Sequence, residues 1–345
     1  MEGFALLPQA TGISPVVLLH ARISVNVPIR GAEFSPRESF RCFHLLADDG
    51  SLLPHDDLAC ASTKASSDEL SNDCDAEEPR NSSFSLGSAL LMTSSSTLAL
   101  VTTSWDDGHP LDLRVAEMLA RCGMTGTFFV PVCDPKRARL SDADLRDLSS
   151  CGFEIGSHGM LHRNLLKAPR TELQWEITDS KFELEQAIGR KVSMFCYPIG
   201  RHDSYVLEQV RQAGYEGART TRMLSTEADF DPMYVPTSIQ AYRHSSSEYL
   251  KNLLRNGGVK DMLRYCTSLY QCDSWVELGR RLFDRVLSQG GTWHLYGHSW
   301  EIEKYGLWDE LAEILAYVCN RPGVQYVRTV DTLRAAAPAY ATQIA

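Results

Sequence analysis

Three features common in other classes of protein are missing from this sequence of 345 residues. No stretch approaches the ~18 consecutive apolar residues that cross a bilayer, so no membrane span is expected. None of the ten cysteines belongs to a C-x-x-C pair, which argues against a zinc ribbon and against a disulfide scaffold. The 34 Lys and Arg are outnumbered by 44 Asp and Glu, which argues against nucleic-acid binding. We therefore expect a soluble globular protein with reduced thiols.

The acidic excess is concentrated in residues 1–97, which hold 13 acidic and 6 basic side chains. Residues 61–97 contain 11 serines, and this composition buries too little apolar surface to offset chain entropy. We predict a partly disordered N-terminal extension and Ser/acidic linker over residues 1–97, of unknown role, followed by a folded domain over residues 98–340. The first residues carry Glu2 and no basic segment, so we expect no secretory signal and a cytoplasmic location.

From Leu98 onward, short β-branched runs alternate with segments of helical period. Strands are predicted at 98–105, 126–132, 153–157, 192–198, 215–221, 291–298 and 324–327. Helices are predicted at 111–122, 141–152, 171–188, 203–213, through much of 246–289, and from Leu307 to Val318. Repeated strand-then-helix units form parallel sheets, and about seven strands favour closure into an α/β barrel.

Two acids stand side by side at the end of the first predicted strand, Asp106 and Asp107. Reactive groups of such barrels lie at the carboxyl ends of the strands, which favours a functional interpretation. A second interpretation is that Asp107 caps the next helix while Gly108 makes the turn.

His158 and His162 follow the third predicted strand, four residues apart, a spacing at which two imidazoles can face one cation. A solvated turn would also accommodate them. Together with an acid from the first strand they form a carboxylate-plus-two-imidazole set for a divalent cation. Such a cation would offset the repulsion between the two acids, with one as ligand and the other free as a base.

His298 ends the strand 291–298, where it can donate a proton to a leaving group. His294 lies four residues earlier, inside the strand, and we expect it to be packed in the core.

The segments TSWDDG, SHGMLH, FCYPIG and LYGH, in this order, resemble the polysaccharide deacetylase family, the chitooligosaccharide deacetylase-homology domain of carbohydrate esterase family 4. The likeness extends over residues 98–335. It implies a distorted (β/α)₇ barrel and the metal-dependent hydrolytic removal of N- or O-linked acetyl groups from a carbohydrate.

The resemblance also implies a role for each residue of the first two motifs and of the last. Asp106 would be the general base and His298 the general acid. Asp107, His158 and His162 would hold the metal, for which Zn²⁺ suits the ligand set and Co²⁺, Ni²⁺ or Mn²⁺ are also accepted in the family.

The third motif departs from the family pattern, Arg-x-Pro-Tyr, because it reads Cys-Tyr-Pro-Ile here. The arginine that holds the catalytic aspartate is missing, and we hypothesise that Arg201 or Arg219 replaces it. The backbone N–H of Ile199 can still serve as an oxyanion donor. We expect substrate or oxyanion contacts from Tyr197, Pro198, Ile199, Arg201 and Arg219.

The fourth motif is replaced by GARTTRM, and Tyr296 stands where the family has a leucine two residues before the acid histidine. The pocket for the acetyl methyl group should therefore differ in shape. Trp300 and Glu301 follow His298 and are further candidates for contacts near the substrate. Glu301 either orients the imidazole or forms an ordinary surface salt bridge.

A metal-dependent carbohydrate deacetylase is the first hypothesis, and an acetylated carbohydrate is the expected partner. The same barrel could instead hydrolyse a non-sugar amide, or bind a carbohydrate without turnover. The complete set of five motif residues argues against the third hypothesis, because a binding protein does not need all of them.

Overall fold

The computed structural model describes residues 98–257, 259–270 and 272–340, so the predictions for residues 1–97 lie outside the described residues. Its strands form one sheet in the order β5-β4-β3-β2-β1-β7-β6, and β8 pairs with β1. All of these pairs are parallel. The strands are β1 (Ala99–Asp106), β2 (Thr127–Val130), β3 (Glu154–Ser157), β4 (Met194–Cys196), β5 (Gly217–Arg219), β6 (Ile239–Gln240), β7 (Gly291–Gly297) and β8 (Val324–Tyr326).

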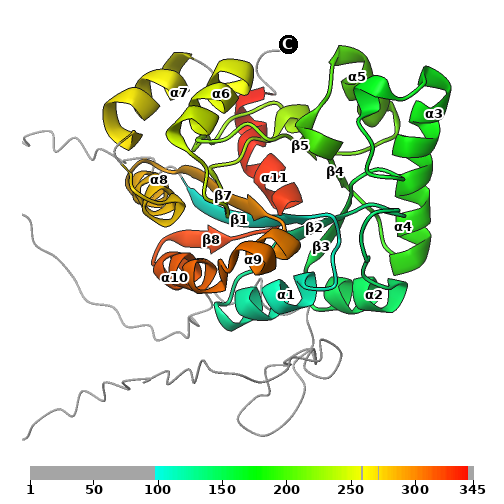
Figure 1. The fold of residues 1–345 in the computed structure, drawn as a ribbon, viewed down its shortest axis with the longest axis horizontal. Coiled ribbons are helices and arrows are strands. Elements are labelled where there is room, and N and C mark those ends of the chain that lie inside the picture. The colour runs from blue at the N-terminus through cyan, green and yellow to red at the C-terminus, as the bar shows by residue number, and fades with distance from the viewer. Residues whose placement is uncertain (1–97, 258, 271, 341–345) are drawn as a thin grey trace, which may run out of the picture. The chain divides into compact units, whose positions relative to one another are not determined.

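The sheet closes into the predicted distorted (β/α)₇ barrel. Its two edges approach each other through the segment before β6, because Arg219 of β5 forms an isolated parallel bridge with Val235. Strand β6 then pairs with β7 through Ile239 and Gln240. The seven strands β1 to β7 therefore form the ring, and the helices lie around them (Figure 1).

One strand of the ring, β6, was absent from the sequence prediction. It has only two residues, too few for an apolar alternation to be recognised. Conversely, the predicted last strand, β8, exists but pairs only with Ala99–Val101 of β1. The other half of β1 pairs with β2, so β8 extends the sheet beside the ring without belonging to it.

The predicted helices are present, and two further ones, α9 and α11, follow β7 and β8. Helix α2 begins with a capping box between Ser141 and Asp144. The predicted helix 171–188 is α3 and α4 joined by a π-helical segment, Trp175–Asp179. The helices are α1 (Asp112–Arg121), α2 (Asp142–Ser150), α3 (Arg170–Gln174), α4 (Ser180–Ile188), α5 (Ser204–Gln212), α6 (Ser246–Asn256), α7 (Val259–Arg264), α8 (Trp275–Gln289), α9 (Ser299–Tyr305), α10 (Trp308–Val318) and α11 (Thr329–Tyr340).

Burial of large side chains inside and around the strands holds the barrel together. All eight residues of β1 and all seven of β7 are buried. Trp105, Phe128, Phe195 and Trp293 are fully buried in the core. Each such side chain contributes roughly 1.5–3 kcal/mol relative to an exposed one, so the strands form a rigid base for their polar ends.

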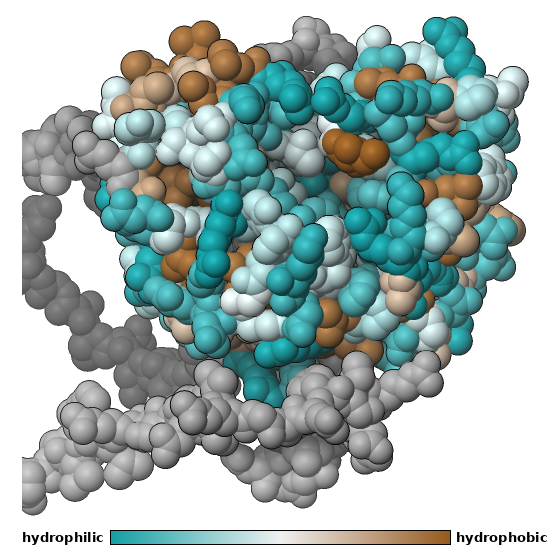
Figure 2. Space-filling model, in the orientation of Figure 1, coloured by the Kyte–Doolittle hydropathy of each residue, from teal (hydrophilic) through white to brown (hydrophobic). Residues whose placement is uncertain are grey.

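The exposed surface is largely polar on the face drawn in Figure 2, with apolar side chains gathered over α6 and α7. Leu250, Leu254, Val259 and Leu263 are exposed there. Across the part of the chain that the structure describes, every helix is too short or too polar to cross a membrane.

Candidate active site

Polar side chains from five of the seven ring strands, or from the residues directly after them, meet at the carboxyl end of the barrel. They surround a pocket of about 280 Å³. Asp106 and Asp107 come from the end of β1, the two histidines of the second motif follow β3, and His298 follows β7. The lining residues are Asp106, Asp107, Arg137, His158, His162, Tyr197, Ile199, Gly200, Thr221, Gln240, Tyr296, His298 and Trp300.

Asp107, His158 and His162 converge as a metal-ligand set would. Oδ1 of Asp107 lies 3.2 Å from Nε2 of His162 and 3.7 Å from Nε2 of His158. This carboxylate oxygen is buried and has no hydrogen-bond partner among the described residues. A buried acceptor without a hydrogen bond is unusual in a purely structural cluster. A cation bound between this oxygen and the two imidazole nitrogens would satisfy it.

Two backbone turns bring these ligands together. Asp107 has a φ of +76° and Gly108 a φ of +59°, so the chain turns sharply as β1 ends. A Cβ at position 108 would lie 2.7 Å from a methyl carbon of Val130, which explains the glycine. His162 also adopts a positive φ, +51°, uncommon for a residue with a side chain. This local cost is consistent with a constraint imposed by function.

His158 is held in the tautomer that ligation needs. Its Nδ1 lies 2.8 Å from the carbonyl oxygen of Cys196. Since a carbonyl only accepts, Nδ1 carries the proton and Nε2 keeps its lone pair toward Asp107. Burial lowers the pKa of His158 to about 4, so the ring is neutral at pH 7.

The loop that carries both histidines is fastened by Glu176. This buried carboxylate accepts hydrogen bonds from the backbone N–H groups of Met160 (3.0 Å) and Leu161 (3.1 Å), between the two histidines. Its other oxygen lies 2.6 Å from Nε of Arg163. Glu176 belongs to the π-helical segment Trp175–Asp179, and such segments are frequent at functional sites.

The negative charge of Asp106 is compensated by a different group from those that surround Asp107. The guanidinium of Arg219, fully buried at the end of β5, contacts both carboxylate oxygens of Asp106. Burial alone would raise the pKa of Asp106, but the charges of Arg219, His158 and His298 and the hydrogen bond from Arg219 together outweigh it and lower the pKa to about 2. Of the two hypothesised replacements for the missing arginine, Arg219 is therefore the one in place, whereas Arg201 is exposed and outside the pocket lining.

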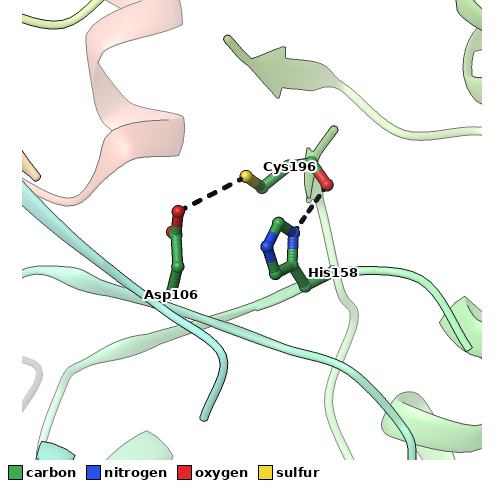
Figure 3. A group of neighbouring side chains, drawn as sticks. All are labelled: Asp106, His158 and Cys196. Atoms are coloured by element: carbon green, nitrogen blue, oxygen red, sulfur yellow. Dashed lines mark hydrogen bonds between the residues drawn. The ribbon is translucent and has the colours of Figure 1, made fainter. Parts of the chain in front are cut away.

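A second triad of candidate ligands, Asp106, His158 and Cys196, lies beside the first (Figure 3). Burial raises the pKa of the Cys196 thiol well above its usual range, so it stays protonated and points its S–H at Asp106 across 3.9 Å. Asp106 already contacts Arg219, and Nδ1 of His158 donates to the Cys196 carbonyl. The triad with Asp107 therefore has the better donor set.

His298 lies between two acids. Its Nδ1 is 2.7 Å from Oε2 of Glu301, and its Nε2 is 3.8 Å from Oδ2 of Asp106. Burial lowers the pKa of His298, but the hydrogen bond to Glu301 and the charges of Asp106 and Asp107 outweigh this and raise it above the ordinary value. Of the two interpretations of Glu301, the structure thus favours the orienting one.

Trp300 and Arg137 complete the surroundings of Asp107. The indole N–H of Trp300 donates to Oδ2 of Asp107 at 2.8 Å. Arg137 lies 3.5 Å from the same oxygen, with its guanidinium 4.4 Å from the centre of the Trp300 ring. These contacts leave Oδ1 as the atom of Asp107 that faces the histidines.

Tyr296 forms the inner wall of the pocket. Its ring lies 4.8 Å from the guanidinium carbon of Arg219, and its hydroxyl donates to Oε1 of Gln240 at 2.7 Å. Gln240 in turn lies 3.3 Å from Glu301. Tyr296, which stands where the resemblance predicts a leucine, is therefore held in the pocket wall by a polar network.

Two residues of the third motif, Tyr197 and Pro198, are buried behind the pocket, and Ile199 lies at its rim. Tyr197 is buried and its hydroxyl donates to the carbonyl of Met233, and Pro198 is buried after it. Ile199 is 60% exposed at the pocket and has a φ of +60°, a strained conformation for a β-branched residue. Ile199 is therefore the exposed member of this motif at the pocket.

The site residues that escaped the sequence prediction include Arg137, Gln240 and Glu176. Arg137 and Gln240 follow no motif, and their proximity to the site arises only from the folded loops. Glu176 did carry a signal, because a charged residue beside Ile177 on a helix's apolar stripe must be paired once it is buried. His294, expected in the core, is buried and bonded to Ser104.

Part of this chain matches a known protein family. Residues 95–218 match the family model described as polysaccharide deacetylase, which confirms the resemblance for that part of the chain. The protein YxkH of Bacillus subtilis (strain 168), provisionally named a polysaccharide deacetylase, is 25% identical over 123 residues, 35% of this chain and 44% of that protein. The match therefore spans less than half of that relative's length.

A crystal structure from Mycobacterium smegmatis, provisionally described as a polysaccharide deacetylase, shares 18% sequence identity with this chain. The TM-score is 0.50, and the alignment covers 72% of this chain and 92% of that one. At this identity the likeness shows a shared fold.

Proposed function

We propose that this chain, whose residues 95–218 belong to the polysaccharide deacetylase family, hydrolyses acetyl groups from a carbohydrate. One observation carries the proposal. Oδ1 of Asp107 is buried, has no hydrogen-bond partner in the part of the chain that the structure describes, and faces two imidazole nitrogens. The same pocket holds an ionised acid, Asp106, and an imidazole of raised pKa, His298.

The ligand set suits a divalent cation, and we propose Zn²⁺, with Co²⁺, Ni²⁺ or Mn²⁺ as alternatives. Asp107, His158 and His162 would hold it. When bound, such a cation would polarise the acetyl carbonyl as a Lewis acid and would lower the pKa of a water molecule bound to it.

Asp106 would act as the general base. Its pKa of about 2 keeps it ionised throughout the working pH range, so it is ready to accept a proton. Arg219 holds the carboxylate in place and favours its ionised form before the reaction. The carboxylate oxygen Oδ2 also lies 3.8 Å from Nε2 of His298, so the two proton carriers share one side of the pocket.

His298 would act as the general acid. The sugar amine or alcohol leaves the acetyl carbon readily only when its nitrogen or oxygen is protonated. A raised pKa keeps more of the imidazole in the acid form that donates this proton. Glu301 orients the ring by its hydrogen bond at Nδ1, which leaves the Nε2 proton directed toward the pocket. The backbone N–H of Ile199, at the rim, is the proposed donor to the developing oxyanion.

Metal content and acetate release test this proposal together. We expect about one zinc per chain in the purified protein, by elemental analysis, and its loss in His158→Ala. His298→Ala is the matched control, because it should keep the metal while acetate release from an acetylated-sugar panel falls ~10²–10⁴-fold. A wild-type chain that binds no divalent ion would contradict the proposal.

A panel of cyclic amides tests the second hypothesis, hydrolysis of a non-sugar amide, against carbohydrate deacetylation. Ring opening of cyclic amides without acetate release from any acetylated sugar would replace carbohydrate deacetylation by hydrolysis of a non-sugar amide. The cytoplasmic location stays a prediction from the sequence.

A further inference from the structure

The outer sides of helices α6 and α7 carry large apolar side chains (Figure 2). Leu250 and Leu254 lie one turn apart on α6, and Val259 and Leu263 lie one turn apart on α7. Leu254 is 72% exposed and Val259 is 87% exposed. Single exposed apolar residues are ordinary, but a group of them marks a surface that contacts another molecule. We refer to these four residues as the apolar ridge.

The apolar ridge is not needed to hold the two helices on the barrel. Helix α6 packs against the core through Tyr249 and Leu253. Helix α7 is fastened by its buried residue Asp261, which lies 2.6 Å from Arg222. A surface helix with its apolar stripe on the core normally has a polar outer side. The outward apolar side chains therefore expose surface to water without stabilising the described fold.

The exposed charges beside the apolar ridge are mostly positive. Lys251 and Arg255 lie on α6 and Lys260 lies on α7, each next in sequence to a residue of the ridge, and all three are exposed. Of the described residues in these two helices, Glu248 is the one exposed acid, and its carboxylate closes the capping box of α6. Because the chain as a whole has a formal charge of −10, this positive group is a local feature.

A groove of about 600 Å³ lies beside α7. Leu263 of the apolar ridge lines it together with Lys260 and Arg285. The groove extends to Gly291, the first residue of β7, so it lies at the amino end of the barrel strands, opposite the candidate active site. The groove and the catalytic pocket are therefore separate.

The two acids that line this groove already have partners. Asp261 lies 2.6 Å from both Arg222 and Arg264, and Glu227 lies 3.1 Å from Arg222. Their negative charges are therefore compensated within the protein. Among the described residues of the groove, the two remaining cations, one on α7 and one on α8, are available to an external anion.

A second copy of the chain matches this surface less well than an anionic membrane does. In a two-fold dimer the same patch faces itself, so its exposed basic side chains would lie opposite an identical set. Of the described residues in α6 and α7, only Glu248 is an exposed acid that could pair with them. Anionic lipid headgroups supply the opposite charge, and acyl chains accept the apolar side chains.

We propose that the apolar ridge and the basic side chains beside it bind the surface of a membrane that contains anionic phospholipid. The ridge enters the boundary between headgroups and acyl chains, and Lys251, Arg255 and Lys260 contact the phosphate groups. Binding of this kind needs no membrane-spanning helix. The proposal adds a binding surface to the proposed function and does not depend on it, because the ridge and the catalytic residues lie on different elements.

Sedimentation with vesicles tests the proposal on the full chain. One set of vesicles is made of phosphatidylcholine alone, and the other of equal parts of phosphatidylcholine and phosphatidylglycerol. We expect binding to the anionic set, and this binding should weaken as the salt concentration rises. The double variant Leu254→Ser with Val259→Ser should bind at least about ten-fold more weakly than the wild type. Lys251→Gln and Lys260→Gln should each weaken binding about five-fold.

Phe182→Ser is the matched control, because Phe182 of α4 is 57% exposed and lies outside the apolar ridge. It should bind the anionic vesicles as the wild type does. No binding by the wild type, undiminished binding by the double variant, or an equal loss in Phe182→Ser would overturn the proposal. A wild-type dimer in light scattering that the double variant converts to a monomer would also overturn it, since that result assigns the surface to a second copy.

Discussion

Asp106 and Asp107 are neighbours in the chain, yet separate groups compensate their charges. Asp106 contacts the buried guanidinium of Arg219. Asp107 turns through a positive φ toward two imidazoles and receives the indole N–H of Trp300. Two adjacent acids are tolerated because each has its own partner, and this separation is what the proposed roles of base and metal ligand require.

Replacing Arg219 by Met should leave Asp106 as an uncompensated buried charge. We expect a loss of about 3–5 kcal/mol in the free energy of unfolding, the usual cost of breaking a buried pair from one side. The double variant Arg219→Met with Asp106→Asn should regain most of that stability without regaining activity. Urea denaturation of the two variants provides the measurement, and equal instability of single and double variants would contradict the pairing.

Replacing Glu301 by Gln should shift the pH dependence of the reaction. Glu301 helps to raise the pKa of His298 through their hydrogen bond, so its loss lowers that pKa. The general acid must be protonated, and activity is lost as the pH rises through its pKa. The alkaline limb of the kcat/KM profile should therefore move to lower pH in Glu301→Gln. An unmoved limb would show that another group sets it.

At the scale of elements, the long helix over residues 170–188 covers the barrel and also supports the loop that carries the two histidines. Its π-helical segment places Glu176 beneath the loop that carries His158 and His162. Because the carboxylate accepts hydrogen bonds from two N–H groups between the histidines, it fixes the loop on which the proposed metal ligands lie. Preorganised ligands bind metals more tightly than mobile ones do.

Replacing Glu176 by Ala should therefore weaken zinc binding, by about ten- to 100-fold as for other groups that support metal ligands. Competition with a zinc chelator measures the affinity without relying on turnover. Glu183→Ala, an exposed glutamate of the adjoining α4, is the control and should bind zinc as the wild type does. Equal affinity in the two variants would remove the role given to Glu176.

The sequence predicted most of the strands and helices of the barrel, but it missed the two-residue strand β6 and the helices α9 and α11. Helix 170–188 and strand β1 each offered enough residues for their period to be recognised, whereas the two residues of β6 did not. Motif residues such as His158 were found because their spacing is local. Arg219 was one of two alternatives, since only the closed barrel shows that β5 directs it at Asp106 across 113 positions of sequence.

At the scale of the whole molecule, the last helix is tied to the first strands at the end of the barrel opposite the active site. The N–H groups of Thr329 and Val330, which begin α11, donate to Oγ1 of Thr127 and Oε2 of Glu154. The Thr127 hydroxyl also donates to Glu154 at 2.6 Å. Glu154 is nevertheless buried, and this burial raises its pKa to about 7.

This carboxyl should make the stability of the folded chain depend on pH. An unfolded glutamate releases its proton near pH 4.5, whereas folded Glu154 keeps it until about pH 7. Between these values the native state binds more protons than the unfolded state, so stability falls as the pH rises, by about 3 kcal/mol in total. Glu154→Gln keeps a neutral acceptor for Thr127 and Val330 and cannot ionise. Denaturation at pH 5 and pH 7 should therefore show the variant gaining on the wild type as the pH rises, whereas parallel losses in both proteins would assign the pH dependence to other groups.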